Sequence, residues 1–266
     1  MTNEELFACA DLPSLHERTV KELKKSPQDA GSRALFVQLL CMEGDWSRAE
    51  AQAEALMKLH PPSAMFCASV CQLIAAERAR ADVFSGKSSP VWAEERPSFA
   101  SSLEEAFQAY GKGELSLGAE KTARVLETLP EIPVSFASGW SADWILDGDS
   151  RLAGVLEFIR GNSYSLVELA SVASLELAKP SHPVDILWPH VRLCLRNGDV
   201  LTGHMPGRYP VSSGMEDSAL LMARASSWTE EAGGVFLGHG QRCWNTPEGL
   251  APMLVETSLY FKDPVL

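Results

Sequence analysis

The stretch ALFVQLLCMEGDWSRAEAQAEALMKLHPP at residues 34–62 decides the fold of the N-terminal half. Apolar residues recur at helical spacing over Arg33–Met42, and an alanine-rich segment follows over Trp46–Leu59. Glycine at 44 allows a tight turn between them, and Pro61 cannot continue a helical hydrogen-bond ladder. The stretch therefore predicts two helices joined by a turn, with the second helix ending before the prolines.

The same pattern occurs three times, each time leading in 17 steps from a small residue to a proline: Ala10 to Pro27, Gly44 to Pro61, and Gly113 to Pro130. The first two spans are 34 residues apart, which is the period of the tetratricopeptide repeat. The third lies 69 residues after the second, and a loop rich in serine, glycine and proline over residues 85–98 comes between them. The spacing predicts an interrupted array of three to four TPR-like helical hairpins.

Strand and turn patterns dominate the chain after Pro133. Val191–Arg196 alternates apolar and polar residues, and Asn197-Gly198 supplies a type I′ turn into a second strand. Further elements are predicted in chain order as strands at 155–160, 163–167 and 173–178, a helix at 216–226, and strands at 235–244 and 253–259. This order predicts an α+β domain built on a mostly antiparallel sheet.

Length and composition indicate two modest domains. The 266 residues and 45% hydrophobic content suffice for a sizeable core, and the change of pattern places the domains at residues 1–133 and 134–266. The net charge of −12 argues against nucleic-acid binding. The sequence has no apolar run long enough for a membrane span and no signal-peptide pattern, so we expect a cytoplasmic protein with its six cysteines reduced.

Motifs that would indicate catalysis are incomplete. Gly86-Lys87-Ser88 resembles the end of a nucleotide-binding P-loop, but Ala81 occupies the position of the first glycine. Gly139-Trp140-Ser141-Ala142-Asp143 lacks the last glycine of a hydrolase nucleophile elbow. The six histidines form no close ligand pair, and His239 between two glycines is interpreted as part of a turn. We therefore predict no catalytic, cofactor-binding or metal-binding residue.

Asp147 and Asp149 have the alternate spacing of calcium ligands. Arg151 occupies the third ligand position, and Leu152 stands where an EF-hand loop requires glycine, so an EF-hand is excluded. A surface turn with an Asp–Arg salt bridge is the default interpretation. The alternative is a small-ligand sensor or enzyme whose site combines Asp147, Asp149 and Arg151 with Arg208 and His239.

Several motifs together give a resemblance that spans nearly the whole chain. In the first half they are Ala34–Cys41 and Gly44-Asp45-Trp46, and in the second half they are Trp144–Leu152, Arg208-Tyr209-Pro210 and Gly240-Gln241-Arg242. With these motifs the chain resembles the type VI secretion accessory family known as ImpE, SciE or TagJ. The proline that usually follows the Asp-Ser-Arg-Leu segment is absent, since Ala153-Gly154 stands there.

The resemblance implies a non-enzymatic bacterial adaptor. Its implied partners are the small contractile-sheath subunit, which is TssB-like, and the ClpV unfoldase that recycles contracted sheath. A helical-repeat groove suits a short partner helix, and the binding site is expected where the two halves meet. The residues expected at a partner or domain interface are Asp147, Asp149, Arg151, Arg208, Tyr209 and Arg242. A third hypothesis is that this protein only stabilises an assembly and binds it without using a groove.

Overall fold

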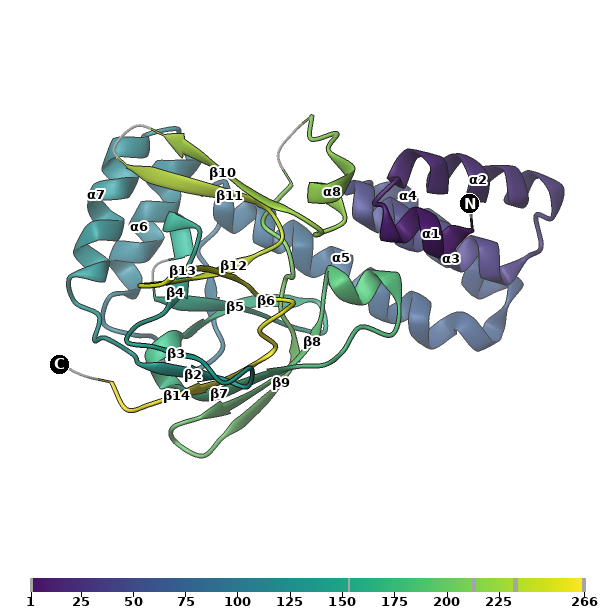
Figure 1. The fold of residues 1–266 in the computed structure, drawn as a ribbon. Coiled ribbons are helices and arrows are strands. Elements are labelled where there is room, and N and C mark those ends of the chain that lie inside the picture. The colour runs from purple at the N-terminus through teal and green to yellow at the C-terminus, as the bar shows by residue number, and fades with distance from the viewer. Residues whose placement is uncertain (1, 153, 212–213, 232–233, 265–266) are drawn as a thin grey trace.

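A computed structural model describes residues 2–152, 154–211, 214–231 and 234–264. Four helices form an arm at one end of the molecule: α1 (Asn3–Ala8), α2 (Leu12–Lys25), α3 (Ala30–Glu43) and α4 (Trp46–Leu59). The long helix α5 (Ala64–Phe84) runs from the arm toward the strands, and α6 (Ala100–Gly111) and α7 (Leu115–Leu126) lie at the far end (Figure 1). These bounds confirm the helices predicted from the repeated stretch.

The residues that open the three repeated spans have left-handed backbone conformations. Their φ angles are 55° at Ala10, 75° at Gly44 and 77° at Gly113. Each lies between two helices, and the side chains of Asp11 and Asp45 cap the helices that follow the first two turns. The sequence pattern therefore marks helical hairpins, while their TPR-like character stays a prediction.

In the described part of the chain, the strands form one nine-stranded sheet and two smaller ones. The order in the large sheet is β1 (Val91–Trp92), β6 (Ser163–Glu168), β5 (Val155–Arg160), β9 (Val200–His204), β8 (His190–Leu195), β7 (Val172–Leu177), β14 (Ser258–Phe261), β2 (Val134–Phe136) and β3 (Ser141–Ala142). The small sheets pair β10 (Ser226–Glu231) with β11 (Val235–Gly240), and β12 (Cys243–Thr246) with β13 (Gly249–Pro252) and β4 (Leu146–Asp147). Only β1 and β6 pair in parallel among the described strands, which confirms a mostly antiparallel sheet.

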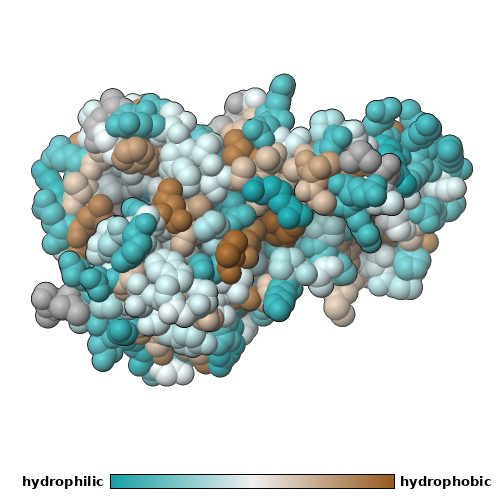
Figure 2. All heavy atoms as spheres, in the orientation of Figure 1, coloured by the Kyte–Doolittle hydropathy of each residue, from teal (hydrophilic) through white to brown (hydrophobic). Residues whose placement is uncertain are grey.

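Helix α5 packs against β6, and the largest hydrophobic cluster contains residues from both sides of residue 133. Strand residues Val155, Ile159 and Leu166 belong to the same cluster as the helices of the arm. The surface view shows hydrophilic residues over the outer arm and hydrophobic residues nearer the middle of the molecule (Figure 2). The division into domains at residue 133 stays a prediction.

Four sequence predictions in the second half differ from the structure. The strand predicted at 235–244 is interrupted at residues 241–242 and forms β11 and β12, which belong to different sheets. The helix predicted at 216–226 is only α8 (Ser218–Leu221), which ends where Ala223 adopts a left-handed φ of 50°. The strand predicted at 253–259 begins five residues later, because Met253–Glu256 turn after Pro252. The Gly-His-Gly at 238–240 lies in β11 rather than in a turn. Side-chain alternation alone does not reveal these breaks.

Candidate functional site

A buried carboxylate, Glu157, lies where α5 crosses the sheet. Its side chain has no exposed surface and accepts hydrogen bonds from Arg80 at 2.6 and 2.9 Å. It also accepts one from Arg242 at 2.8 Å and one from the Tyr164 hydroxyl at 2.8 Å. Glu157 therefore ties a helix of the first half to two parts of the second half.

The charges around Glu157 stabilise one another against the cost of burial. Burial alone would raise the pKa of Glu157, but Arg80 and Arg242 hold it below its usual value. Burial would likewise lower the pKa of Arg80, but the carboxylates of Glu157 and Glu77 raise it above its usual value. Both groups are therefore ionised near neutral pH and form a buried ion pair.

The sequence-predicted site residues Asp147 and Asp149 are both buried and paired. Arg242 donates to Asp147 through Nε at 3.0 Å and through a shorter second contact. Arg151 donates to Asp149 at 2.9 and 2.6 Å, and the Gly238 amide donates to the same carboxylate at 3.0 Å. The predicted Asp–Arg salt bridge is confirmed. Its expected place on the surface is wrong, because Asp149 is only 1% exposed.

Arg208 caps the end of a helix in the arm. Its guanidinium donates to the carbonyls of Met42 at 2.6 Å and Cys41 at 2.9 Å in the last turn of α3, and to the carbonyl of Leu221. Burial lowers the pKa of Arg208 to about 10, so the side chain stays charged at neutral pH. A cation is favourable at this position because the carbonyl end of a helix dipole is negative.

Tyr209 lies on the strand side of the junction, by which we mean the place where α3 and α5 meet the strands. Its hydroxyl accepts a hydrogen bond from the Cys243 amide at 3.1 Å. Of the other predicted interface residues, Asp147 and Arg242 belong to the Glu157 network and Arg208 caps α3. Asp149 pairs with Arg151, which packs over the Phe84 ring at the end of α5. His239 lies on β11, where its Nε2 is 2.8 Å from the Thr229 hydroxyl.

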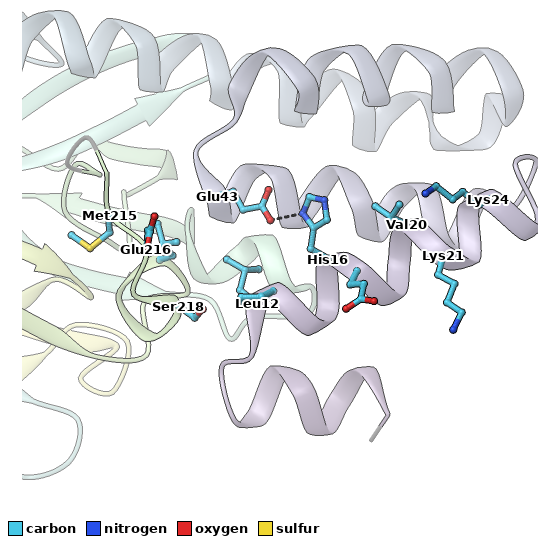
Figure 3. Close-up of a pocket in the computed structure, with 12 residues that line it drawn as sticks. Leu12, His16, Val20, Lys21, Lys24, Glu43, Met215, Glu216 and Ser218 are labelled. Atoms are coloured by element: carbon cyan, nitrogen blue, oxygen red, sulfur yellow. Dashed lines mark hydrogen bonds and ion pairs between the residues drawn. The ribbon is translucent and has the colours of Figure 1, made fainter.

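An open groove of about 980 Å³ runs along the arm beside this junction (Figure 3). One wall is a single face of α2, which contributes Leu12, His16, Val20 and Lys24 at helical spacing. The inner end of the groove is lined by the end of α3 and by the segment 215–221 before and within α8 (Figure 3). On this face of α2, Nδ1 of His16 lies 2.5 Å from the Glu43 carboxylate.

The network residues Arg80 and Glu157 were not predicted from the sequence. They are 77 positions apart, so no local spacing reveals the pair. Glu157 did leave a signal, because it is the only charged residue among the five buried positions of β5, and a buried charge requires a partner. The part played by residues 215–221 in lining the groove was not predicted either, because a continuous helix was expected at 216–226 and the structure has only the short α8 there.

The described residues were also searched for a metal site and for a membrane-spanning helix. Within 2–152, 154–211, 214–231 and 234–264, His, Cys, Asp and Glu side chains do not gather into groups of three or more that could hold a metal ion. The described helices also include none long and apolar enough to span a bilayer.

Comparisons with known proteins find similarity over nearly the whole chain. The family model described as ImpE protein matches residues 139–259. The type VI secretion system accessory component TagJ of Pseudomonas aeruginosa is 27% identical over 98% of this chain and 89% of its own. The crystal structure of protein VPA1032 from Vibrio parahaemolyticus is 25% identical, covers 98% of both chains and has a TM-score of 0.88. These matches confirm the family resemblance that the motifs indicated.

Proposed function

Because residues 139–259 carry an ImpE domain, we propose that the chain is a non-enzymatic accessory protein of a bacterial type VI secretion system, acting in the cytoplasm. Support comes from its likeness to TagJ, which is named as such a component. The geometry adds support, since Asp147, Asp149 and Arg208 are buried and bonded to groups of the same chain. Substrate chemistry at these groups would require these bonds to break.

The proposed partner is the small contractile-sheath subunit, bound as a short helix. The observation that carries this step is the groove beside α2, whose wall is a helix face about 18 Å long from Leu12 to Lys24. A helix of about 12 residues spans that length. Val20 on the α2 face and Met215 at the inner end are partly exposed and offer a surface for the apolar face of an amphipathic helix.

The family resemblance extends the proposal to ClpV as a second partner. An adaptor between the two needs a surface besides the groove. The far end of the molecule, which carries α6 and α7, lies on the other side of the strands from the arm that carries the groove (Figure 1). We assign the unfoldase contact to that end, so that groove variants should leave it intact.

Calorimetric titration with the N-terminal segment of the small sheath subunit tests the proposal. We expect binding in the low micromolar range or tighter, and at least tenfold weaker binding to Val20→Glu, because the new charge would be desolvated by the bound helix. The matched control is Val200→Glu, since Val200 is 46% exposed on β9 and lies outside the groove. No binding to the unaltered protein at high micromolar concentration would rule out the sheath helix as the partner.

A further inference from the structure

The groove beside α2 carries opposite charges at its two ends. Lys21 and Lys24 lie toward the C-terminal end of α2, while Glu43 and Glu216 lie at the end nearest the sheet. Figure 3 shows the two lysines on the outer side of His16 and the two glutamates on the inner side. Glu17 lies between the ends, one helical turn before Lys21.

These charges are placed where an occupant can meet them. Lys21, Lys24 and Glu216 are exposed, and the Glu43 side chain keeps 24% of its surface accessible beside His16. Val20 is partly exposed between the charged ends and Met215 is partly exposed at the inner end, whereas Leu12 and Leu221 are only 3% and 6% exposed. The groove therefore combines partly exposed apolar groups with a basic outer end and an acidic inner end.

We infer that the groove selects a helix that runs antiparallel to α2, with acidic side chains in its first turn and basic side chains in its last turn. Acidic first turns and basic last turns are also what the helix dipole favours within the bound helix itself. In the antiparallel direction the acidic turn meets Lys21 and Lys24, and the basic turn meets Glu43 and Glu216. A helix of the same sequence bound parallel to α2 would place like charges together at both ends.

This inference rests on the proposed function only in requiring a helical occupant. The antiparallel direction has a second physical advantage, because neighbouring helices then align their dipoles in opposite senses. The contribution of exposed charges is modest and sensitive to salt. We therefore expect charge to set direction and specificity, and the partly exposed apolar groups Val20 and Met215 to supply most of the affinity.

The experiment uses the full chain and two designed 12-residue peptides with the same composition and the same leucine face. One has glutamates in the first turn and lysines in the last, and the other mixes both charges at each end. A chemical staple on the outer face keeps both peptides helical, and fluorescence anisotropy measures their affinities. We expect the ordered peptide to bind about tenfold more tightly at low salt and the preference to shrink as salt rises.

The direction of binding is read from a photo-crosslinker at the N-terminus of the ordered peptide. We expect crosslinks near Lys24, mapped by mass spectrometry. The K21E/K24E variant should abolish the preference for the ordered peptide. The control K25E/K58E, which changes the net charge equally at exposed positions outside the groove, should retain it. Crosslinks near Met215, equal affinity for both peptides, or no binding of either would each overturn the inference.

A separate result addresses the proposed function. If the ordered peptide binds antiparallel to α2 but the sheath segment does not bind, the groove has the inferred polarity and the proposed sheath partner is wrong. If the sheath segment binds but neither designed peptide shows the charge preference, the partner stands and the inferred polarity is wrong.

Discussion

At the scale of single residues, the structure depends on charges that burial would otherwise make unfavourable. Glu157 is fully buried and is shared by Arg80 and Arg242, so each ion has an opposite charge within hydrogen-bond distance. Such a cluster adds little to stability over a well-packed apolar alternative, but removing Glu157 leaves Arg80 and Arg242 with only Glu77 and Asp147 as counter-charges. The network therefore makes the contact between α5 and the strands specific.

Replacing Glu157 with Gln should destabilise the protein by about 3 kcal/mol, because two buried guanidinium groups lose a shared counter-charge. Urea denaturation measures the change in unfolding free energy. The matched control is Glu176→Gln, since Glu176 pairs with Arg192 at 3.8 Å on an exposed surface and such pairs contribute at most about 1 kcal/mol. Equal losses in the two variants would show that burial of the network does not matter.

The stability difference between the unaltered protein and Glu157→Gln should depend on pH. The pKa of Glu157 is held below its usual value of 4.5 by Arg80 and Arg242, despite burial. A carboxylate with a lowered folded-state pKa stabilises the fold fully above its unfolded pKa, and this contribution is lost as pH falls through the folded pKa. Burial raises the pKa of Asp147, which acts in the opposite sense but is present in both proteins.

Denaturation at a series of pH values checks this prediction. We expect a constant gap between the two proteins above about pH 5 and a gap that narrows steadily below pH 4.5. A gap that stayed constant down to pH 3 would mean that folding does not shift the pKa of Glu157.

At the scale of elements, the hairpin turns follow from local sequence. Gly44 and Gly113 have φ angles of 75° and 77°, and among the described residues no atom lies within 4 Å of a Cβ added at either position. Conformation rather than space therefore decides the cost of a side chain there. Alanine at either position should lower the unfolding free energy by about 1 kcal/mol.

Thermal and urea denaturation of Gly44→Ala, Gly113→Ala and the double variant test this account. The two costs should add, because the turns belong to separate hairpins. Gly31→Ala is the control, since Gly31 lies within α3 and its added Cβ would meet only ordinary contact at 3.6 Å. That substitution should be neutral or stabilising. A loss at Gly31 as large as that at Gly44 would contradict the conformational explanation.

Local patterns predicted most helices and hairpins but not how they meet. The turn at Asn197-Gly198 and the second helix of the repeat, Trp46–Leu59, have short-range signals, and both lie where the sequence placed them. The interface residues Asp147, Arg208 and Arg242 were selected from motifs, yet their burial depends on segments far away in the chain. No spacing rule predicts that Arg208 caps α3, because the bonded groups are 166 and 167 residues apart.

At the scale of the whole molecule, helices and strands share the largest hydrophobic cluster, and a second cluster lies mostly among the strands of the second half. Trp46 of the arm packs against Trp188 of the second half with ring centroids 5.9 Å apart. The Gln38 side chain of α3 accepts a hydrogen bond from the Val184 amide at 3.2 Å. Together with the Arg80–Glu157 pair, these contacts make the arm a structural support for the strands. The groove walls should therefore be held in fixed relation to each other.

The shared core predicts that the full chain unfolds in one cooperative transition. Far-UV circular dichroism and tryptophan fluorescence should give coincident denaturation curves. Fragments 1–133 and 134–266 should each lack a cooperative transition when produced alone, because Val155, Ile159 and Leu166 would lose their helical partners and Glu157 would lose Arg80. Mixing or co-expressing the fragments should restore it. Two separate transitions in the full chain, or a well-folded fragment 134–266 by NMR dispersion, would show that the halves are independent and that the groove can change width as the arm moves.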